Sequence, residues 1–321
     1  LHEVDVEDLL PRDKIEVDMD AIGALLAGKC ILITGAAGSI GSEMVRQVAR
    51  FKPSRMILID QAETPMHDIR LMMSRKYSDI DNLTIVTSIA NKRHMEKIFA
   101  EYRPEYVFHA AAYKHVPMME DDPAIAVQNN IYGTRVIADL AVKYGTRKFV
   151  MISTDKAVNP TNVMGCSKRI CEIYCQSLSQ AIQAGKVQGV TQFVTTRFGN
   201  VLGSNGSVIP IFKEQIANGG PVTVTHPDII RFFMLIPEAC RLVLEAGTMG
   251  KGGEIFVFDM GKPVKIVDLA KRMIQLSGAT NVEIKFTGLR DGEKLYEEVL
   301  NDSEGTLPTT NPKIKVARTR E

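Results

Sequence analysis

The feature that most limits the possible fold of this chain is a short apolar run followed directly by three regularly spaced glycines. Residues 30–34 (Cys-Ile-Leu-Ile-Thr) have the continuous apolar character of a strand buried on both faces of a parallel sheet. Gly35, Gly38 and Gly41 follow directly, and an amphipathic helix opens within them. Glycines at this spacing let the backbone turn tightly and approach a pyrophosphate at the helix N-terminus. The segment therefore predicts a strand–turn–helix unit that binds a dinucleotide.

The same alternation of apolar runs and amphipathic stretches continues along the chain, and it predicts the following elements. Strands are expected at 55–60, 83–86, 106–109, 148–153, 192–197 and 255–258, and helices at 92–101, 125–144 and 163–184. Strands that alternate with helices form right-handed units in a doubly wound parallel sheet. We expect an α/β fold, with a Rossmann domain and a smaller C-terminal substrate-binding lobe.

The domain boundaries follow from shifts in composition. Residues 29–200, continued by 225–260, carry the alternating pattern of the Rossmann domain. Residues 201–224 and 261–321 contain more Gly, Pro and isolated short elements, which suits the smaller lobe. Residues 1–28 are rich in acidic and aliphatic residues and resemble a linker leading into the fold.

Composition excludes several classes of function. The formal net charge of the 321 residues is +1, so nothing favours nucleic acid or a membrane surface as a partner. No run of 18 apolar residues exists that would span a bilayer. The five cysteines lack a Cys-x-x-Cys pair, and we interpret them as reduced thiols with neither a disulfide nor a metal site.

Further residues extend the dinucleotide site. Ser39 and Ile40 lie inside the glycine segment, at the start of the helix. Asp60 ends the second strand, where a carboxylate can accept hydrogen bonds from the adenosine ribose and repels a 2′-phosphate, so NAD is favoured over NADP. Ala110 and Ala111 end the fourth strand, where bulky side chains would block a nicotinamide cofactor.

A second cluster of polar residues follows the fifth strand. Thr154, Asp155 and Lys156 supply a hydroxyl, an acid and an amine at the strand end. Met164 and Lys168 come shortly afterwards and lie one turn apart on the same face of the next helix. Methionine has no proton to give or take, so proton transfer at this site depends on its polar neighbours.

Several motifs in this order carry a resemblance to a known family. They are Gly35 to Gly41, His109-Ala-Ala-Ala-Tyr-Lys-His-Val-Pro117, Ser153-Thr-Asp-Lys-Ala157, Met164-x-x-x-Lys168, Arg197-Phe-Gly-Asn-Val-Leu-Gly203 and Gly288-Leu-Arg-Asp-Gly-Glu-Lys294. From residue 29 onward the chain resembles the bacterial nucleotide-sugar 4,6-dehydratases, extended short-chain dehydrogenases that act on UDP-N-acetylglucosamine in glycan biosynthesis. Ordinary short-chain dehydrogenases have Tyr where this chain has Met164.

The resemblance implies a reaction. A tightly held NAD removes hydride from C4 of the sugar, water is lost across C5–C6, and the hydride returns to C6. Asp155 is expected to protonate the leaving C6 hydroxyl, Lys156 to remove the C5 proton, and Thr154 to bind the C4 oxygen. Lys168 is expected to bind the nicotinamide ribose. Because Met164 replaces Tyr, Asp155, Lys156 or a water held by Lys168 must deprotonate the C4 hydroxyl; these alternatives stay open.

The UDP-sugar is expected to contact residues from several segments. Asn200 matches the position that binds the sugar diphosphate in the family. Arg290 offers a planar fork for the pyrophosphate, and Glu293 can accept hydrogen bonds from the uridine ribose. Lys114 and His115 follow the fourth strand, where they can meet the sugar or its phosphates.

Two other functions stay possible on the sequence alone. A UDP-sugar 4-epimerase also oxidises C4 but needs no acid at C6, and a non-catalytic sensor of NAD or nucleotide sugars would explain the missing Tyr. The residues Thr154, Asp155, Lys156 and Lys168 together argue for the dehydratase. The resemblance further implies a homo-oligomer, an N-terminal membrane region ahead of the 1–28 linker, and a place at the cytoplasmic face of the bacterial inner membrane.

Overall fold

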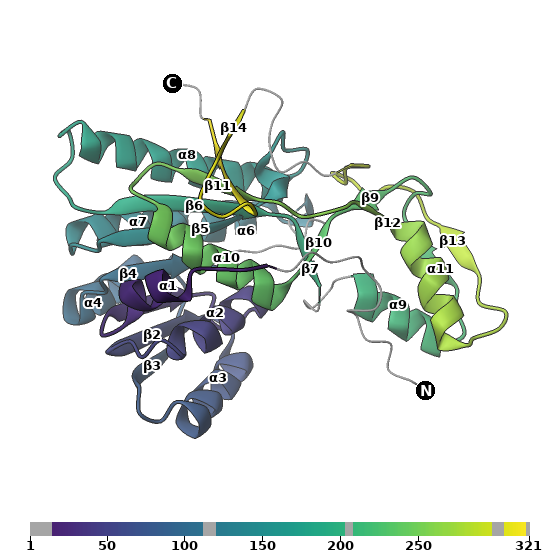
Figure 1. Ribbon diagram of the computed structural model, residues 1–321, viewed down its shortest axis with the longest axis horizontal. Helices are drawn as coiled ribbons and strands as arrows, with labels where there is room; N and C mark the ends of the chain where they lie inside the picture. The colour runs from purple at the N-terminus through teal and green to yellow at the C-terminus, as the bar shows by residue number, and fades with distance from the viewer. Residues whose placement is uncertain (1–14, 112–119, 203–207, 297–304, 319–321) are drawn as a thin grey trace.

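A long, mostly parallel sheet forms the centre of the molecule. The computed structural model describes residues 15–111, 120–202, 208–296 and 305–318, and Figure 1 shows their arrangement. The sheet within these residues comprises β1 (Cys30–Thr34), β2 (Arg55–Asp60), β3 (Asp81–Val86), β4 (Tyr106–His109), β5 (Lys148–Thr154), β6 (Gln192–Phe198), β11 (Ile255–Phe258), β14 (Thr306–Pro308) and β15 (Ile314–Ala317). The six strands that we predicted after residues 30–34 are all present, and β3 begins two residues earlier than expected.

The order of the strands places the ligand-binding edge. It runs β14-β15-β11-β6-β5-β4-β1-β2-β3, and the pairs from β3 to β11 are parallel. The chain moves outward in one direction through β1, β2 and β3, then returns to pair β4 with the other side of β1. Ligands of such sheets bind at the carboxyl ends of the strands, where the order reverses. Here that point lies between the ends of β1 and β4.

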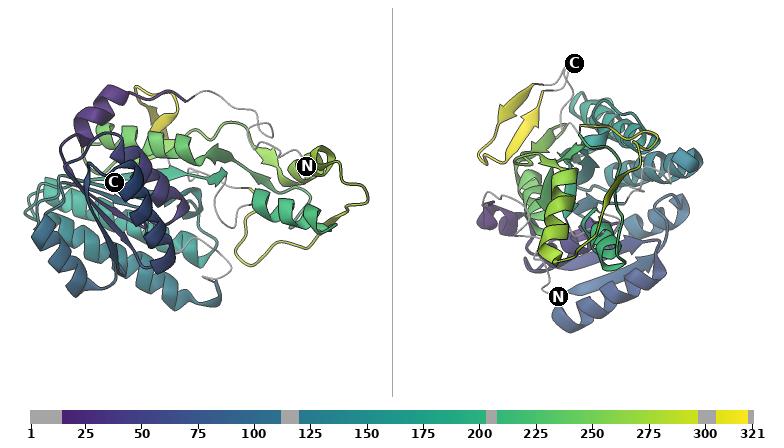
Figure 2. Two further views of the ribbon diagram at one scale, coloured as in Figure 1. Left: turned by 90° about the horizontal axis from the view of Figure 1, so that it is seen from below. Right: turned by 90° about the vertical axis from the view of Figure 1, so that its right-hand side faces the viewer.

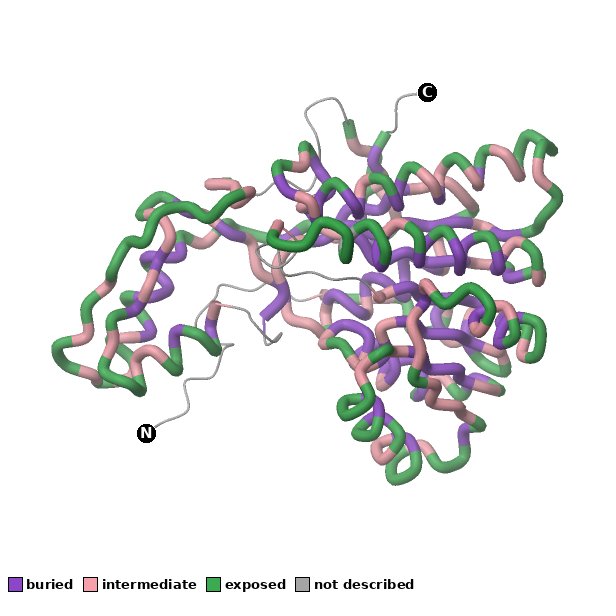
Figure 3. The backbone as a smooth tube through the Cα atoms, turned by 180° about the vertical axis from the view of Figure 1, so that it is seen from behind, coloured by how far each residue is buried: buried purple, intermediate pink, exposed green. Residues whose placement is uncertain are grey.

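Helices cover both faces of the sheet and enclose two apolar cores. One core contains side chains of α1 (Met19–Leu26), α2 (Ser39–Ala49), α3 (Glu63–Lys76) and α10 (Ile236–Met249). The other contains side chains of α4 (Lys92–Tyr102), α7 (Gly133–Lys143) and α8 (Val163–Gln183). The inner strands β1, β2, β4, β5, β6 and β11 are accordingly buried along most of their length, as the purple tube in Figure 3 shows, whereas β3 at the edge is partly exposed. The continuous apolar runs in the sequence therefore reflect a sheet covered on both sides.

A smaller lobe extends from the carboxyl edge of the sheet. It contains α9 (Val208–Ala217), α11 (Ile266–Ser277) and the parallel pair β8 (Val222–Val224) and β13 (Ile284–Phe286), which share a separate apolar core. Two further pairs connect the lobe to the sheet: β7 (Asn200–Leu202) with β10 (Phe233–Leu235), and β9 (Ile230–Arg231) with β12 (Val264–Lys265). Figure 2 shows that this lobe projects well beyond the sheet and its helices. The expected α/β fold with a smaller lobe is confirmed.

The two ends of the described chain lie differently from our expectation. We assigned all of 261–321 to the lobe, but β15 pairs antiparallel with β11 and β14 pairs with β15, so both strands extend the main sheet. Part of the expected linker 1–28 forms α1, whose Ile22 and Leu26 are fully buried in the sheet's core. Both differences come from contacts between segments that are distant in sequence. The local composition of a segment does not predict such contacts.

The predicted helix over 125–144 contains an irregular stretch. It begins as α6 (Pro123–Ala126), continues as the π-helix η2 (Val127–Tyr132) and ends as α7. The wider turn buries Asn130, whose amide donates to Ser167 Oγ on α8 at 2.8 Å. Single π-helical turns within α-helices occur often at functional sites. The stretch thus connects this helix to the one that carries Met164 and Lys168.

A buried ion pair joins α8 to two strands of the sheet. The carboxylate of Glu172, which is fully buried, accepts from Arg197 Nε at 2.9 Å and from its terminal nitrogen at 2.6 Å. It also accepts from Ser153 Oγ at 2.6 Å and from Arg169 at 3.0 Å. Ser153 lies in β5 and Arg197 in β6, so one side chain fixes the position of α8 over the carboxyl ends of both strands.

Removing one partner of this pair is expected to destabilise the fold strongly. Glu172→Met removes the carboxylate that the buried Arg197 charge pairs with, and breaking such a pair typically costs about 3–5 kcal/mol in the free energy of unfolding. The double variant Glu172→Met/Arg197→Met removes both charges and is expected to recover most of that loss. Urea unfolding of the three proteins measures this difference. Equal stability of the single and double variants would contradict a coupled pair.

Candidate functional site

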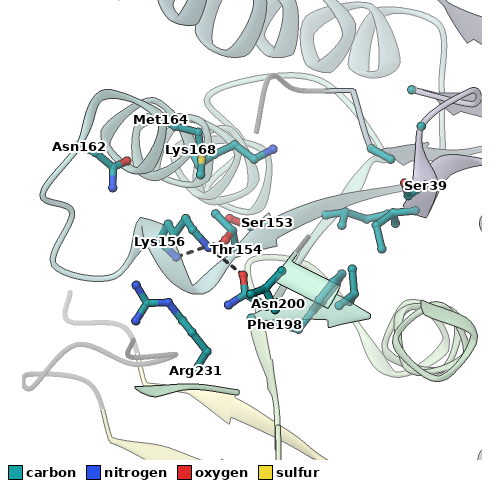
Figure 4. Close-up of a pocket in the computed structure, with 18 of the residues that line it drawn as sticks. Ser39, Ser153, Thr154, Lys156, Asn162, Met164, Lys168, Phe198, Asn200 and Arg231 are labelled. Carbon is teal, nitrogen blue, oxygen red and sulfur yellow. Dashed lines mark hydrogen bonds between the residues drawn. The ribbon is translucent and has the colours of Figure 1, made fainter. Parts of the chain in front are cut away.

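A large cavity lies between the carboxyl edge of the sheet and the lobe. Its volume is about 680 Å³. Three sets of residues line it: the glycine turn and the ends of β2 and β4, the ends of β5 and β6 with the start of α8, and the facing side of the lobe. Figure 4 shows the middle of this cavity, with Lys156 and Asn200 near Thr154 and Arg231 facing them. Most of the predicted site residues therefore meet in one space.

The glycine turn forms a cradle that leaves no room for a side chain at its first and last glycines. Gly35 has a φ of +65°, and a Cβ there would lie 2.7 Å from the backbone of Ala110. At Gly41 a Cβ would lie 1.8 Å from the carbonyl oxygen of Gly35. Gly35, Gly38, Ser39, Ile40 and Gly41 all line the cavity, and α2 begins at Ser39. This close-packed turn at a helix N-terminus fits the pyrophosphate of a dinucleotide.

Asp60 holds the turn as well as facing the cavity. One carboxylate oxygen accepts from the backbone N–H of Ala37 at 3.1 Å, and the other accepts from that of Ala62 at 2.9 Å. The residue is partly exposed at the end of β2 and lines the cavity. Its remaining acceptor positions are available to ribose hydroxyls, which fits the expected adenosine end.

A buried histidine supports the strand ends beneath the cavity. His109 lies with Nδ1 2.7 Å from Thr34 Oγ1 and Nε2 2.8 Å from Thr134 Oγ1, and it is fully buried. Burial, with the nearby charge of Lys168 as a smaller cause, holds the pKa of His109 well below its usual value. A neutral imidazole thus joins β1, β4 and α7. Ala110 and Ala111 follow it and line the cavity, as we expected from their small size.

The segment Thr154 to Lys156 leaves the sheet in a tight turn. After β5 the chain forms the 3₁₀ turn η3 (Asp155–Ala157), and Thr154 Oγ1 accepts from the backbone N–H of Lys156 at 3.3 Å. Thr154 and Lys156 line the cavity, whereas Asp155 is 1% exposed and lies behind them. Lys156 Nζ is 3.5 Å from Asp155 Oδ1 and donates to Asn200 Oδ1 at 3.3 Å. The Lys156 amine therefore faces the cavity, and the Asp155 carboxyl contacts the amine from the buried side.

Two glycines pack closely against this turn. A Cβ on Gly199, after β6, would lie 2.7 Å from Asp155 Oδ2. A Cβ on Gly165, in the first turn of α8, would lie 2.1 Å from the carbonyl oxygen of Lys156. A side chain at Gly165 would displace the backbone of the turn, and one at Gly199 would displace the Asp155 carboxylate. The neighbouring backbones therefore fix the Asp155–Lys156 pair closely.

Met164 and Lys168 lie one above the other on α8, as the spacing predicted, and both line the cavity. Met164 is 3% exposed and Lys168 5% exposed, so little of either side chain reaches solvent. Burial lowers the pKa of the Lys168 ammonium, and nearby Cys171 and Glu172 offset this only in part. An apolar thioether and a desolvated amine thus border the space between the cofactor cradle and Lys156.

The lobe contributes charged residues from two segments. Asn200, Arg290 and Glu293 line the cavity as we expected from sequence. Arg231 also lines it; its guanidinium donates to the carbonyl oxygens of Lys294 at 2.7 Å and of Leu295 at 3.2 Å. Sequence analysis missed Arg231, because it lies in a stretch of short isolated strands without a recognisable motif. Lys114 and His115 lie outside the described residues.

Comparisons with known proteins agree with this architecture. Residues 31–319 match the family described as "Polysaccharide biosynthesis protein". The chain is 53% identical over 307 residues to the capsular polysaccharide biosynthesis protein CapD of Staphylococcus aureus, covering 95% of this chain and 50% of the relative. It is 35% identical to a UDP-glucose 4-epimerase of Rickettsia akari, covering 87% of this chain and 80% of that one. The chain thus spans about half the length of CapD.

Two solved structures share the fold. Pen from Bacillus thuringiensis superimposes with a TM-score of 0.83 at 32% identity, covering 91% of this chain and 89% of that one. DesIV, a dTDP-glucose 4,6-dehydratase from Streptomyces venezuelae, superimposes with a TM-score of 0.73 at 20% identity, covering 84% and 88%. These likenesses, the matched family and the cradle at the sheet's carboxyl edge give one conclusion. The chain belongs to the polysaccharide biosynthesis protein family, whose members have the extended short-chain dehydrogenase fold.

Proposed function

We propose that the protein is an NAD-dependent UDP-N-acetylglucosamine 4,6-dehydratase. One observation carries the proposal: the Lys156 amine faces the cavity with the Asp155 carboxyl 3.5 Å away, between the dinucleotide cradle and the charged side of the lobe. An epimerase needs no acid and base beside C5 and C6. The product would be UDP-2-acetamido-2,6-dideoxy-hexos-4-ulose and one water.

The cofactor would be held by the residues around the glycine turn. Gly35, Gly38 and Gly41 would cradle its pyrophosphate, Asp60 its adenosine ribose and Lys168 its nicotinamide ribose. When bound, NAD supplies a hydride acceptor for C4 and later a hydride donor for C6. The Asp60 carboxylate disfavours a 2′-phosphate, and this supports NAD over NADP.

Lys156 is the group best suited to remove the C5 proton. Its amine is the one basic group of the Thr154–Lys156 turn, and Asn200 orients it through a 3.3 Å hydrogen bond. The side chain is 21% exposed, so it reaches the cavity while its neighbours exclude most water. A 4-keto group acidifies the C5 proton, which lets an amine act as the base.

Asp155 would protonate the C6 hydroxyl as it leaves. Because the carboxyl is 1% exposed behind Lys156, it must reach the sugar by a small movement of the turn or through Lys156 and Thr154. Thr154 Oγ1, 3.2 Å from Asp155 Oδ1, would bind the C4 oxygen. Met164 carries no proton, so Asp155, Lys156 or a water held by Lys168 would take the C4 hydroxyl proton.

The UDP half would occupy the lobe side of the cavity. Arg231, Arg290 and Lys294 line the cavity there, and the planar guanidinium groups of the two arginines suit a diphosphate. Asn200 would contact the sugar diphosphate and Glu293 the uridine ribose. Lys114 and His115 stay predicted contacts of the sugar or its phosphates.

The second candidate is a UDP-sugar 4-epimerase, which the name of the Rickettsia akari relative favours. A non-catalytic sensor stays the third. For the dehydratase we favour retention of the C5 configuration, by family resemblance alone.

Assembly and location are proposals of the same kind. Ile170 and Ile173 on α8 are 46% and 47% exposed, and Val127 and Tyr132 on η2 are also exposed. Apolar side chains on α8 support a homo-oligomer that pairs through this helix. We also propose attachment to the cytoplasmic face of the inner membrane through a further region of the full-length protein. The part of the chain that the structure describes contains no helix long and apolar enough to cross a membrane.

Incubation with UDP-N-acetylglucosamine and catalytic NAD is expected to yield a product lighter by one water. No net reduced nicotinamide should accumulate, because the hydride returns to the product. Mass spectrometry with absorbance of the reduced cofactor measures both. A product of unchanged mass would indicate the epimerase, and no turnover would indicate the sensor.

Lys156→Met is expected to abolish exchange of the C5 hydrogen with solvent deuterium, because no other amine of the turn reaches C5. Cofactor binding should survive, since the glycine turn and Asp60 are separate from Lys156. Nuclear magnetic resonance of the sugar in deuterated buffer measures the exchange. Lys143→Met removes an exposed lysine far from the cavity and serves as the control. Exchange at the normal rate in the Lys156 variant would exclude it as the base.

Asp155→Asn is expected to lower the rate of dehydration by about 10²- to 10⁴-fold, the usual effect of losing a general acid. Asparagine keeps the size that fits against Gly199 but has no proton of comparable acidity. Steady-state rates of the variant measure the loss. Asp259→Asn, at a carboxylate outside the cavity lining, is the matched control. Near-normal dehydration by the Asp155 variant would remove it from this role.

A further inference from the structure

Residues 290–295, which we call the strap, run from the lobe to the loop in front of α8. The carbonyl oxygen of Gly292 accepts two hydrogen bonds from that loop, from Thr161 Oγ1 at 2.9 Å and from Asn162 Nδ2 at 3.0 Å. Lys294 Nζ donates to the carbonyl oxygen of Val158 in the same loop. The strap is thus bonded to the segment between η3 and α8.

Asn162 takes part in two structures at once. It is the N-cap of α8, with an extended backbone, and its Oδ1 accepts from the Gly165 N–H at 2.7 Å. Its Nδ2 donates to the strap. Gly165 in turn packs against the carbonyl oxygen of Lys156, as described above. The 9% exposed side chain of Asn162 therefore connects the strap to the helix turn that carries Met164.

The contact at Gly292 requires glycine. Its φ is +77°, and a Cβ there would lie 2.6 Å from Asn162 Cβ and 3.3 Å from the carbonyl oxygen of Thr161. Both the conformation and the space exclude other residues. The strap thus packs closely against the loop at Gly292.

The other side of the strap is held by the lobe's buried cation. Arg231, 8% exposed, donates to the carbonyl oxygens of Lys294 and Leu295, and it lies 3.9 Å from the Glu293 carboxylate. Arg290 belongs to the strap itself and lines the cavity. One guanidinium group on the strap and one beside it therefore line the cavity, where an anionic group of a ligand would meet them.

We propose that the strap couples occupancy of the diphosphate end of the cavity to the order of the first turn of α8, with Asn162 as the positioning residue. The ligand's identity rests on the proposed function. Arg231 already holds residues 294 and 295 of the strap through their carbonyl oxygens. A diphosphate that also binds Arg290 would fix the other end of the strap, and the Gly292 carbonyl would then fix Asn162, Gly165 and the Lys156 backbone. Such coupling requires the diphosphate to bind the fixed state better, and it is reciprocal.

The test uses UDP alone as the probe and the full chain as the protein. In the wild type, UDP is expected to slow amide hydrogen exchange at residues 161–166, although it lacks the N-acetylglucosamine of the proposed substrate. Thr161→Val/Asn162→Ser removes both donors to Gly292, because valine has no hydroxyl and serine is too short. Serine still caps the helix. In this double variant the UDP-dependent slowing is expected to vanish.

Because the coupling is reciprocal, loosening the first turn of α8 should also weaken the binding of UDP. Calorimetry should find UDP binding to the double variant weaker by about two- to tenfold, the usual worth of a lost hydrogen bond. Turnover of UDP-N-acetylglucosamine should fall more than the KM rises, because the first turn of α8 is misplaced after the nucleotide has bound. Asn91→Ser makes the same change in the cap of α4, where Asn91 accepts from the His94 N–H, and should leave the UDP-dependent slowing intact.

The outcomes separate this inference from the proposed function. UDP that binds the wild type without slowing exchange at 161–166 overturns the coupling alone. Equal slowing in the double variant and the wild type also overturns it. A wild type that does not bind UDP overturns the proposed function together with the coupling. The coupling is supported if UDP slows exchange at 161–166 in the wild type and in Asn91→Ser but not in the double variant. The double variant should then unfold at a temperature similar to that of Asn91→Ser.

Discussion

The site depends on the buried carboxylate of Glu172. It joins Arg197 in β6, Ser153 in β5 and the middle of α8, and these three elements carry most of the polar residues at the centre of the cavity. Lys168 lies one helical turn before Glu172, Thr154 directly follows Ser153, and Asn200 follows Arg197 by three residues. One desolvated ion pair thus sets the distances among groups from three segments. Such pairs contribute little net stability compared with apolar replacements. Here the pair's hydrogen bonds hold three elements of the site together.

Sequence analysis anticipated the part of the molecule in which local pattern and global fold agree. Continuous apolar strands and the spacing of Gly35, Gly38 and Gly41 have few other uses, and the structure confirms the sheet that they predict. The pairing of β15 with β11 escaped prediction, because it joins segments more than fifty residues apart. Arg231 escaped for a related reason: its position in the cavity follows from contacts with Lys294 and Leu295 in another segment.

In the Thr154–Lys156 turn, adjacent residues of the sequence have different surroundings in the structure. The sequence presents Asp155 and Lys156 as equivalent neighbours, but the 3₁₀ turn directs the amine into the cavity and the carboxyl beneath it. Gly199 and Gly165 permit this arrangement, because a Cβ at either position would lie within 2.7 Å of the turn. Neither glycine belongs to the Gly35–Gly41 pattern, and their close contacts with the turn are visible only when the neighbouring backbones are in place.

The antiparallel pair β14 and β15 has a consequence for solubility. Without it, β11 would form the edge of a long parallel sheet and present unpaired backbone groups to other chains. The pair covers that edge and ends it with Pro308, which has no N–H to donate. A chain shortened before residue 305 would therefore expose an apolar strand, Ile255–Phe258, as a template for aggregation. Although distant from the cavity, the last strands thus cover the β11 edge of the sheet.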